Sequence, residues 1–401
     1  MTTVVETTTS DNAIDHTELV SRAEALIPLL QKNAVSTEEH RRVDQDNIDA
    51  MDQAGLFRVS VPRRHGGFEA DFRTWIAIEE ALGRGDGSTA WAFSLLNIGN
   101  WFVGLYGEQA QEEIYGTAGG ARTCGVFTPS GSSTKVDGGW RVTGKWGFAS
   151  GSWHANWAMV GFPLTDSDGN PDVGFGMIPV SDYSIEETWF VAGMSGSGSN
   201  TVVLDDVFVP EHRVLALGAS AVHGLPTPFT DESLYQAPFL APGCLILAGP
   251  QLGLARAALD LVIEKAGRRG IAYSSYEQQT YAPTVQLAVA EAAAQIESAR
   301  ALVYTLCDEV TTTVAAGRTL ELADRTRIRV ANAYAIKTAR EAIRTLVSAH
   351  GASSFANANP LQRIWRDSEA ASRHAFALFE TAAEVHGKVL LGVDELPTTL
   401  L

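Results

Sequence analysis

The sequence predicts a mainly α-helical protein with a central antiparallel β-barrel and a C-terminal four-helix bundle. Three observations lead to this fold class. Apolar residues recur at helical spacing from residue 17 to about 115, the pattern then shortens and alternates up to residue 214, and long helical segments return from residue 235. The predicted units are a disordered tail (1–16), an N-terminal helical domain (17–120), a β-barrel domain (121–214), a loop or lid (215–234) and a helical bundle (235–401).

The N-terminal block contains several predicted helices. The Ser-Thr-Glu-Glu stretch at 36–39 resembles a capping box that opens a second helix, and Gly55 is typical of a residue that ends one. Two further helices are expected over Arg73–Gly83 and Ser88–Tyr106. The last is so rich in aromatic and aliphatic residues that we expect it to be buried on most sides.

The middle block is expected to be a compact antiparallel barrel or sandwich. Lys135–Val142 carries the signal of a β-hairpin, and 166–171 forms another turn between strand-like runs. A further strand is expected from Thr201 to Val209, ended by Pro210. The Gly-, Pro- and Ser-containing segment 215–234 follows as a long loop, and long loops in compact proteins are often lids.

Four long helices are expected to form the C-terminal bundle, over 235–267, 280–315, 318–349 and 360–391. Asn359-Pro360 is a start signal for the last of them. His374 shares a face of that helix with Asp367 and Ala371, so it should project into the surface against which the helix packs. On this helix alone, a hydrogen-bonded core histidine is the simpler interpretation.

Composition excludes several classes of function. The chain has 30 basic and 47 acidic side chains, a net charge of -17, which argues against nucleic-acid and membrane surfaces. Cys124, Cys244 and Cys307 lie far apart, so neither a disulfide framework nor a metal site is expected. The N-terminus lacks the features of a signal peptide, and no apolar run of membrane-spanning length stands out. A cytoplasmic protein is therefore expected.

Three short motifs suggest a ligand site, although each has a simpler structural interpretation. Gly193–Ser199 is not a dinucleotide loop because a strand follows it and no βαβ unit surrounds it, so it is either a flexible turn or part of a pocket. Gly144–Trp153 alternates aromatic and small residues and offers Ser150 beside a surface for a flat ring, or else forms barrel core. The turn His350–Ser354 suits a phosphate or simply links two helices. Arg268 and Arg269 end the first bundle helix, where they could pair with a phosphate or remain solvated charges at the helix C-terminus.

Together the three blocks resemble the acyl-CoA dehydrogenase fold from about residue 17 to 392. The motifs that carry the resemblance are Thr128-Pro129-Ser130, Lys145-Trp146, Asp205–Pro210 and Arg366-Asp367. True dehydrogenases carry a catalytic Glu about two turns after the Arg-Asp pair, whereas this chain has Ala371-Ser372-Arg373-His374-Ala375. The sequence from Asn359 to His374 is instead similar to that of two-component (group D) flavin-dependent monooxygenases, which include 4-hydroxyphenylacetate, phenolic-steroid and aromatic natural-product hydroxylases.

The resemblance implies a function and a set of site residues. The chain would be the oxygenase component of a two-component system. It would use O2 and reduced flavin (FADH2 or FMNH2), which a separate NAD(P)H-dependent reductase supplies. Through a C4a-hydroperoxyflavin it would hydroxylate a small phenolic or indole-type substrate. His374 would be the catalytic base, with a pKa near 6.5, and Ser150 would bond to the flavin N5 region. The other expected cofactor-binding residues are Thr128, Ser130, Trp146, Phe148, Arg268, Gly351, Ser353, Ser354 and Asn359; the expected substrate walls are Trp101, Phe127 and Trp153.

Further implications concern assembly and alternatives. The family usually forms homotetramers whose flavin sites are completed across subunits. Some members place a second histidine near the end of the N-terminal block, where this chain has Asn97-Ile98-Gly99-Asn100. An N-oxygenase of an amine or amino-sugar, an acyl-CoA dehydrogenase with a relocated carboxylate, and a non-enzymatic flavin-binding protein remain as alternatives.

Overall fold

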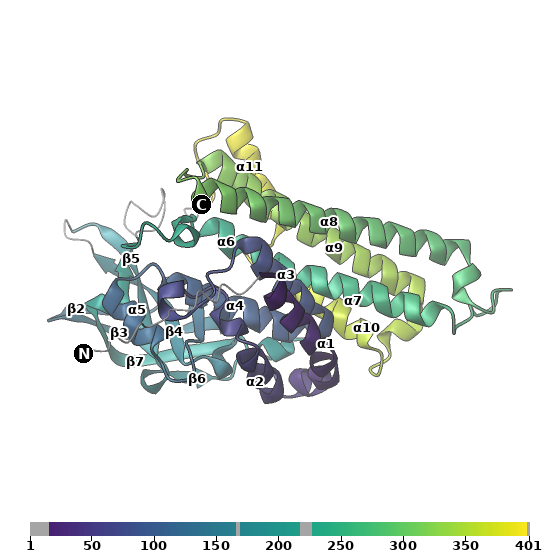
Figure 1. Cartoon of the computed structure of the whole chain (residues 1–401), viewed down its shortest axis with the longest axis horizontal. Helices are drawn as coiled ribbons and strands as arrows, with labels where there is room; N and C mark the ends of the chain where they lie inside the picture. Colours follow the sequence, from purple (N-terminus) through teal and green to yellow (C-terminus); the bar gives the residue numbers. More distant parts are fainter. Residues whose placement is uncertain (1–15, 166–168, 217–226, 399–401) are drawn as a thin grey trace, which may run out of the picture.

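The computed structural model describes residues 16–165, 169–216 and 227–398. The predicted tail up to residue 15, part of the turn at 166–171 and half of the loop at 215–234 (residues 217–226) lie outside these residues. Figure 1 shows the β-strands and the first helices gathered at one end, while long C-terminal helices project at the other. The N-terminal helices are α1 (His16–Glu39), α2 (Gln45–Gln53), α3 (Phe72–Gly85), α4 (Gly87–Val103) and α5 (Glu108–Tyr115).

The predicted capping box at 36–39 was wrong, because these residues form the last turn of α1. Their side chains instead hold the start of α2. Ser36 Oγ donates to Asp44 Oδ2 at 2.8 Å, and Thr37 Oγ1 accepts the backbone N–H of Asp44 at 3.1 Å. Asp44 is the residue that caps α2, through a bond from Asp46 N to its carboxylate.

Helix α4 runs through the centre of the molecule, and nearly all of its residues are buried, as the sequence predicts. Its N-terminus is capped by the Asp86 carboxylate, which accepts from the backbone and hydroxyl groups of Thr89. Gly99 allows β1 to approach closely, since a Cβ there would lie 2.0 Å from Thr123 O. The buried helix α4 therefore packs directly against β1.

The eight described strands form two four-stranded sheets, and no ladder closes them into a barrel within the part of the chain that the structure describes. The sheet orders are β1-β4-β5-β8 and β2-β3-β7-β6. The expected hairpin at 135–142 is confirmed by the antiparallel register of β2 and β3. The expectation of a purely antiparallel block was wrong, because β1 and β4 run parallel. The strands are β1 (Thr123–Val126), β2 (Ser132–Val136), β3 (Gly139–Ala149), β4 (Trp157–Thr165), β5 (Pro171–Pro179), β6 (Ser184–Glu186), β7 (Asn200–Pro210) and β8 (Val214–Ala216).

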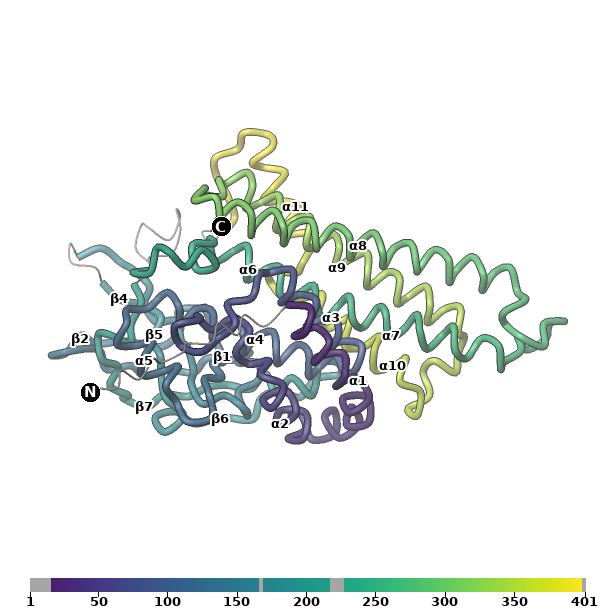
Figure 2. Tube along the Cα trace, viewed as in Figure 1, coloured from purple at the N-terminus to yellow at the C-terminus, as the bar shows by residue number. Residues whose placement is uncertain are grey.

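The C-terminal part is helical, but two of the four predicted helices are each divided. The helices are α6 (Leu240–Leu245), α7 (Ala248–Ala266), α8 (Pro283–Ala315), α9 (Leu322–His350), α10 (Pro360–Ala371) and α11 (Phe379–Leu390). Figure 2 shows α10 and α11 in different parts of the molecule. The expected helix 360–391 is therefore wrong between 372 and 378, and His374 lies in the connection that replaces it.

One segment has the length and composition of a membrane span. Leu240–Ala266, which comprises α6 and α7, contains an 18-residue window with a mean hydropathy of 1.4. The expectation that no apolar run reaches this length was therefore wrong. The window is 72% buried, and its residues pack against α3 and α9. The apolar character of this segment is explained by its place in the core.

Candidate active site

An apolar cavity of about 560 Å³ lies where α4, the ends of β1 and β3, the α6–α7 corner and the α10–α11 connection meet. Two residues from distant parts of the sequence, Ser150 and His374, line the same cavity. Among the residues that the structure describes, no Asp or Glu lines it. The other lining residues are Leu95, Ile98, Gly125, Val126, Phe127, Thr128, Pro129, Gly147, Phe148, Phe239, Gly243, Ile246, Leu247, Arg373, Ala375 and Phe376.

His374 is held in the tight turn that follows α10. Its backbone carbonyl accepts from Ala377 N at 2.8 Å and from Leu378 N at 2.9 Å. Its ring stands edge-on to Trp91 and Phe376, with centroid distances of 5.7 and 5.8 Å. These contacts fix the imidazole at the cavity wall with little freedom to turn.

The electrostatic state of His374 differs from the one expected for a free histidine. Burial lowers its pKa to about 4, so the expectation of a pKa near 6.5 is wrong. The backbone N–H of Phe376 donates to Nδ1 at 3.2 Å. A neutral ring with Nδ1 as an acceptor carries its proton on Nε2. In this arrangement His374 offers a hydrogen-bond donor at Nε2, and action as a base there would require the other tautomer.

Ser150 reaches the cavity because β3 is irregular near its end. The register with β7 shifts between Trp146 and Ala149, and Phe148 adopts a positive φ of 65°. A bulge of this kind re-aims side chains at the end of a strand. Phe148 is consequently 76% exposed at the cavity, while Ser150 is buried beneath it and accepts a hydrogen bond from Trp91 Nε1 at 3.2 Å.

The Arg366-Asp367 pair connects α10 to the neighbouring loop. Asp367 is buried and accepts from Met194 N at 2.6 Å, and Arg366 forms an ion pair with Glu38 at 2.6 Å. Burial, and then the nearby Asp86 carboxylate, raise the pKa of Asp367 to about 7. The loop that contains Met194 is thus anchored to the helix that leads to His374.

Of the predicted site residues, five line the cavity, namely Phe127, Thr128, Phe148, Ser150 and His374. Others lie outside it. Trp101 is fully buried beside Tyr235 and donates to Leu234 O, while Trp146 lies between the sheets and donates to Gly161 O at 2.7 Å. Ser130 also bonds to Gly161 O, through its backbone N–H.

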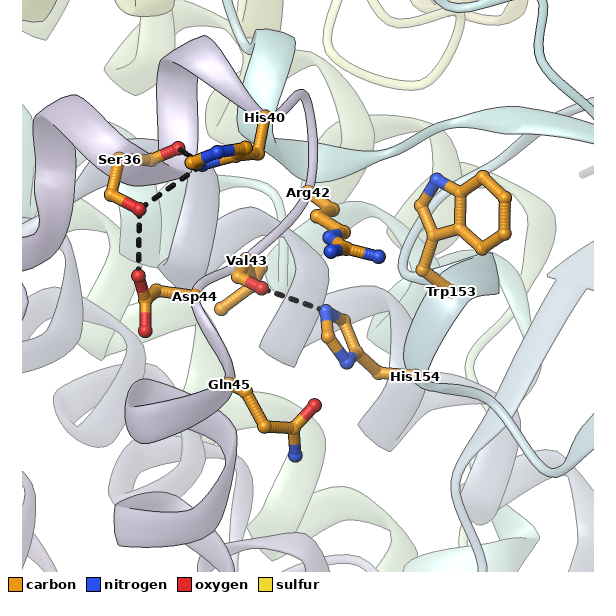
Figure 3. A pocket seen from close by; sticks show the side chains of 8 residues that line it. All are labelled: Ser36, His40, Arg42, Val43, Asp44, Gln45, Trp153 and His154. Carbon is orange, nitrogen blue, oxygen red and sulfur yellow. Dashed lines mark hydrogen bonds between the residues drawn. The ribbon is translucent and has the colours of Figure 1, made fainter.

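Trp153 does not line this cavity either. It borders a second, polar cavity of about 470 Å³ between the α1–α2 connection and the turn Ser152–His154 (Figure 3). His154 in that cavity bonds to Val43 O at 2.9 Å, and burial lowers the pKa of its imidazole to about 4. Trp153 and Ser150 are three residues apart, but they belong to different pockets.

The turn after α9 and the end of α7 form a polar cluster at the projecting end of the bundle. Arg269 contacts His350 Nε2 at 2.5 Å and Ser353 Oγ at 2.6 Å. Asn359 caps α10 and donates to Ser353 O at 2.9 Å, while Lys265 reaches its side-chain oxygen at 3.5 Å. This bundle-end cluster carries two basic groups and no carboxylate of its own.

The remaining predicted residues of that region take different positions. Arg268 is exposed and faces Glu264 at 3.6 Å, and Gly351 allows the turn through its positive φ of 83°. Ser354 is buried and donates to Val347 O. None of these residues lines the apolar cavity.

Several cavity residues were missed by sequence reasoning. Phe239 and Phe376 line the cavity from two separate segments, and only the fold brings them together. Trp91 lies behind the wall, where it contacts His374 and Ser150. The missing second histidine has a local explanation. Asn97 and Asn100 are fully buried and donate to backbone carbonyl groups, so Ile98 occupies the position that faces the cavity.

Comparisons with known proteins agree with this architecture. Residues 22–118 match the N-terminal domain of acyl-CoA dehydrogenase and residues 245–379 match its C-terminal domain. The flavin-dependent monooxygenase oxygenase subunit HsaA of Rhodococcus jostii (strain RHA1) is 35% identical over 373 residues, which cover 92% of this chain and 97% of that protein. The oxygenase component of the FADH(2)-dependent resorcinol hydroxylase of Rhizobium sp. (strain MTP-10005) is 32% identical over 401 residues, covering 94% and 95%.

A solved structure supports the same relation. XiaF from Streptomyces sp., in complex with FADH2 and glycerol, matches with a TM-score of 0.88 and 32% identity over 94% of this chain and 96% of that one. These matches define a protein of the acyl-CoA dehydrogenase fold. The chain belongs to the family of flavin-dependent monooxygenase oxygenase components built on that fold, and the resemblance drawn from the sequence is thereby confirmed.

Proposed function

We propose that this protein is the oxygenase component of a two-component system that hydroxylates a small phenolic or indole-type ring. It would take reduced flavin from a separate NAD(P)H-dependent reductase and use O2 as co-substrate. The observation that carries the proposal is that His374 and Ser150, which are 224 positions apart in the sequence, line one apolar cavity and both contact Trp91. When bound, the reduced flavin supplies the activation of oxygen.

The residues around Phe148 fit an isoalloxazine ring. The Phe148 side chain is 76% exposed and lines the cavity, so it offers an apolar surface that a flat ring would cover. Thr128 and Pro129 form the adjacent rim, and Ser150 provides a buried hydroxyl at the inner edge. Phe148, Thr128 and Ser150 would therefore hold the ring.

The deeper walls fit an aromatic substrate. Phe127, Phe239 and Phe376 pack edge-on or tilted against one another, with centroid distances of 4.3 Å between the first two and 6.0 Å between the last two. Such walls exclude water, which protects reactive oxygen species from unproductive loss. His374 would bind the substituent of the ring through Nε2. No carboxylate lines the cavity in the described part of the chain, which disfavours α-proton abstraction and hence an acyl-CoA dehydrogenase.

The bundle-end cluster is proposed to complete the flavin site of a neighbouring copy in a homotetramer. Arg269 and Lys265 supply positive charge, and the backbone of the His350–Ser354 turn supplies donors, a combination suited to phosphate groups. Arg268 projects from the same end of α7 and could add a further charge. In Figure 1, α7 and α10 belong to the part of the molecule that projects away from the strands. The bundle-end cluster lies at the first residues of α10, whereas residues 373–376, which line the apolar cavity, follow its last residue.

A subunit-mixing experiment tests this assembly. Chains carrying Ser150→Ala and chains carrying Arg269→Ala are co-expressed with different tags, and the hybrid oligomer is purified. If each site combines Ser150 from one chain with Arg269 from another, the hybrid contains some wild-type sites and recovers activity at low flavin concentration. Activity no greater than that of the two parent variants would contradict sites shared between subunits. Sedimentation of the wild-type protein gives the number of subunits.

The reaction itself is tested by supplying chemically reduced FAD or FMN, oxygen and a panel of phenols, indoles and amines, with mass spectrometry for the gain of one oxygen atom. Hydroxylation of a phenol or an indole is the expected result. Oxidation of an amine alone would identify an N-oxygenase, and reaction of acyl-CoA with an electron acceptor would identify a dehydrogenase.

A cytoplasmic location is also proposed, supported by three buried free thiols.

A further inference from the structure

The Gly193–Ser199 segment, which has no dinucleotide-binding context, supplies two serine hydroxyls that extend from Ser150 to form a chain of three behind the cavity. Ser150 Oγ lies 2.7 Å from Ser199 Oγ, which lies 2.8 Å from Ser197 Oγ. All three serines are buried, with exposures of 6%, 3% and 1%. Trp91 Nε1 donates to Ser150 at 3.2 Å, and an indole N–H can only donate.

This chain can run in two directions because each hydroxyl has one hydrogen and two acceptor positions. In one direction, Ser197 donates to Ser199 and Ser199 donates to Ser150. Both acceptor positions of Ser150 are then filled, so its hydrogen points into the cavity. In the other direction, Ser150 donates to Ser199 and Ser199 donates to Ser197, which leaves Ser150 free to accept from the cavity.

The segment that carries the second and third hydroxyls is firmly held. Gly151 N donates to Ser197 O at 2.8 Å, and Ser152 Oγ donates to Gly198 O at 2.9 Å. The packing is also close, since a Cβ on Gly193 would lie 2.1 Å from Arg366 O. The three oxygen atoms therefore keep their spacing while the hydrogens between them reverse.

We propose that the Ser150–Ser199–Ser197 chain is a reversible hydrogen-bond relay that lets Ser150 bind the flavin N5 in both of its hydrogen-bonding states. This inference rests on the proposed function, which places a flavin against Ser150. N5 carries a hydrogen in reduced flavin and is a bare acceptor in oxidised flavin. Ser150 accepts from the first by donating to Ser199, and donates to the second by accepting from Ser199. Ser199 is thus a positioning residue for the reduced form.

The test compares the affinities of the two flavin states. Removal of the Ser199 hydroxyl leaves Ser150 able to donate to oxidised flavin, but its hydrogen has no acceptor when reduced flavin donates to it. We expect Ser199→Ala to weaken binding of reduced flavin about fivefold to tenfold and binding of oxidised flavin less than about twofold. Anaerobic titration gives the first affinity and fluorescence quenching gives the second. Ser199→Thr, which keeps the hydroxyl, should restore the wild-type ratio.

Two more variants separate the relay from the flavin placement on which it rests. Ser197→Ala should change the ratio in the same direction as Ser199→Ala, whereas Ser150→Ala should weaken both flavin states. If Ser150→Ala weakens both states while Ser199→Ala weakens both equally or neither, the relay is wrong and the flavin placement stands. If Ser150→Ala changes neither affinity, both are wrong. Circular dichroism and thermal unfolding show that each variant is folded.

Discussion

Two regions of this molecule each contain a histidine with a pKa near 4, but the causes differ. At the apolar cavity, burial alone lowers the pKa of His374. At the bundle end, burial is joined by the positive charges of Arg269 and Lys265, which lower the pKa of His350. A similar histidine pKa thus arises from burial at the cavity and from burial together with positive charge at the bundle end. This difference agrees with the proposal of an aromatic ring at the cavity and a phosphate at the bundle end.

Helix α10 connects the two regions. It begins at the bundle-end cluster, where Asn359 caps it, and it ends at Ala371, just before His374. Midway along it, Asp367 accepts from the loop that carries the serine chain. The helix therefore fixes the spacing between the two regions, and a variant at either end is expected to disturb one region without the other.

The largest expected effect is a loss of hydroxylation caused by a substitution at the cavity alone. His374→Ala should reduce hydroxylation by about 100-fold or more, since it removes the polar group that faces the substrate. Binding of reduced flavin should change little, because Phe148, Thr128 and Ser150 remain. Product is quantified by mass spectrometry, and hydrogen peroxide release measures the oxygen that is lost. His374→Gln, which keeps a donor, is the matched variant and should retain more product. Undiminished hydroxylation by His374→Ala would remove this residue from the mechanism.

A smaller effect, on flavin affinity, is expected from a substitution in the bundle-end cluster alone. Arg269→Ala removes a charged donor to His350 and Ser353, and it should weaken binding of reduced FAD about tenfold. Riboflavin, which lacks phosphate, should bind equally well to the variant and to the wild type. The exposed Arg268, paired at 3.6 Å with Glu264, provides the comparison variant Arg268→Ala. A loss of affinity for riboflavin as large as that for FAD would show that Arg269 does not bind phosphate.

The sequence was sufficient to predict most of the helices, one hairpin and two of the residues that line the cavity. Helical periodicity predicted the buried helix α4, and the hairpin signal located β2 and β3. Resemblance to a family, rather than spacing, singled out Ser150 and His374, and both line the cavity. Local pattern failed at 372–378, where Ala, Ser and Arg are compatible with a helix but the chain turns.

Tertiary context explains the other failures. Trp101 and Trp153 belong to aromatic-rich stretches, but one packs against Tyr235 in the core and the other borders a separate polar cavity. Their directions depend on neighbours that are distant in sequence. The pKa of His374 was misjudged for the same reason, because burial by Trp91 and Phe376 cannot be inferred from the helix that precedes it.

The last prediction concerns the stability of the fold and not its function, and it involves Asp367, which lies between the two regions. Its pKa in the folded protein is about 7, above the ordinary value of 3.8. Between these two pH values the carboxyl group of the folded protein holds a proton that the unfolded chain releases. The free energy of unfolding therefore falls as the pH rises, by at most about 1.4 kcal/mol per pH unit from this group. Above pH 7 this slope ends. Asp367→Asn keeps an oxygen for Met194 N but cannot titrate. Thermal unfolding at pH 5, 6, 7 and 8 should show that the wild type loses more stability, relative to the variant, from pH 5 to 7 than from pH 7 to 8. Parallel curves for the two proteins would show that Asp367 does not hold this proton.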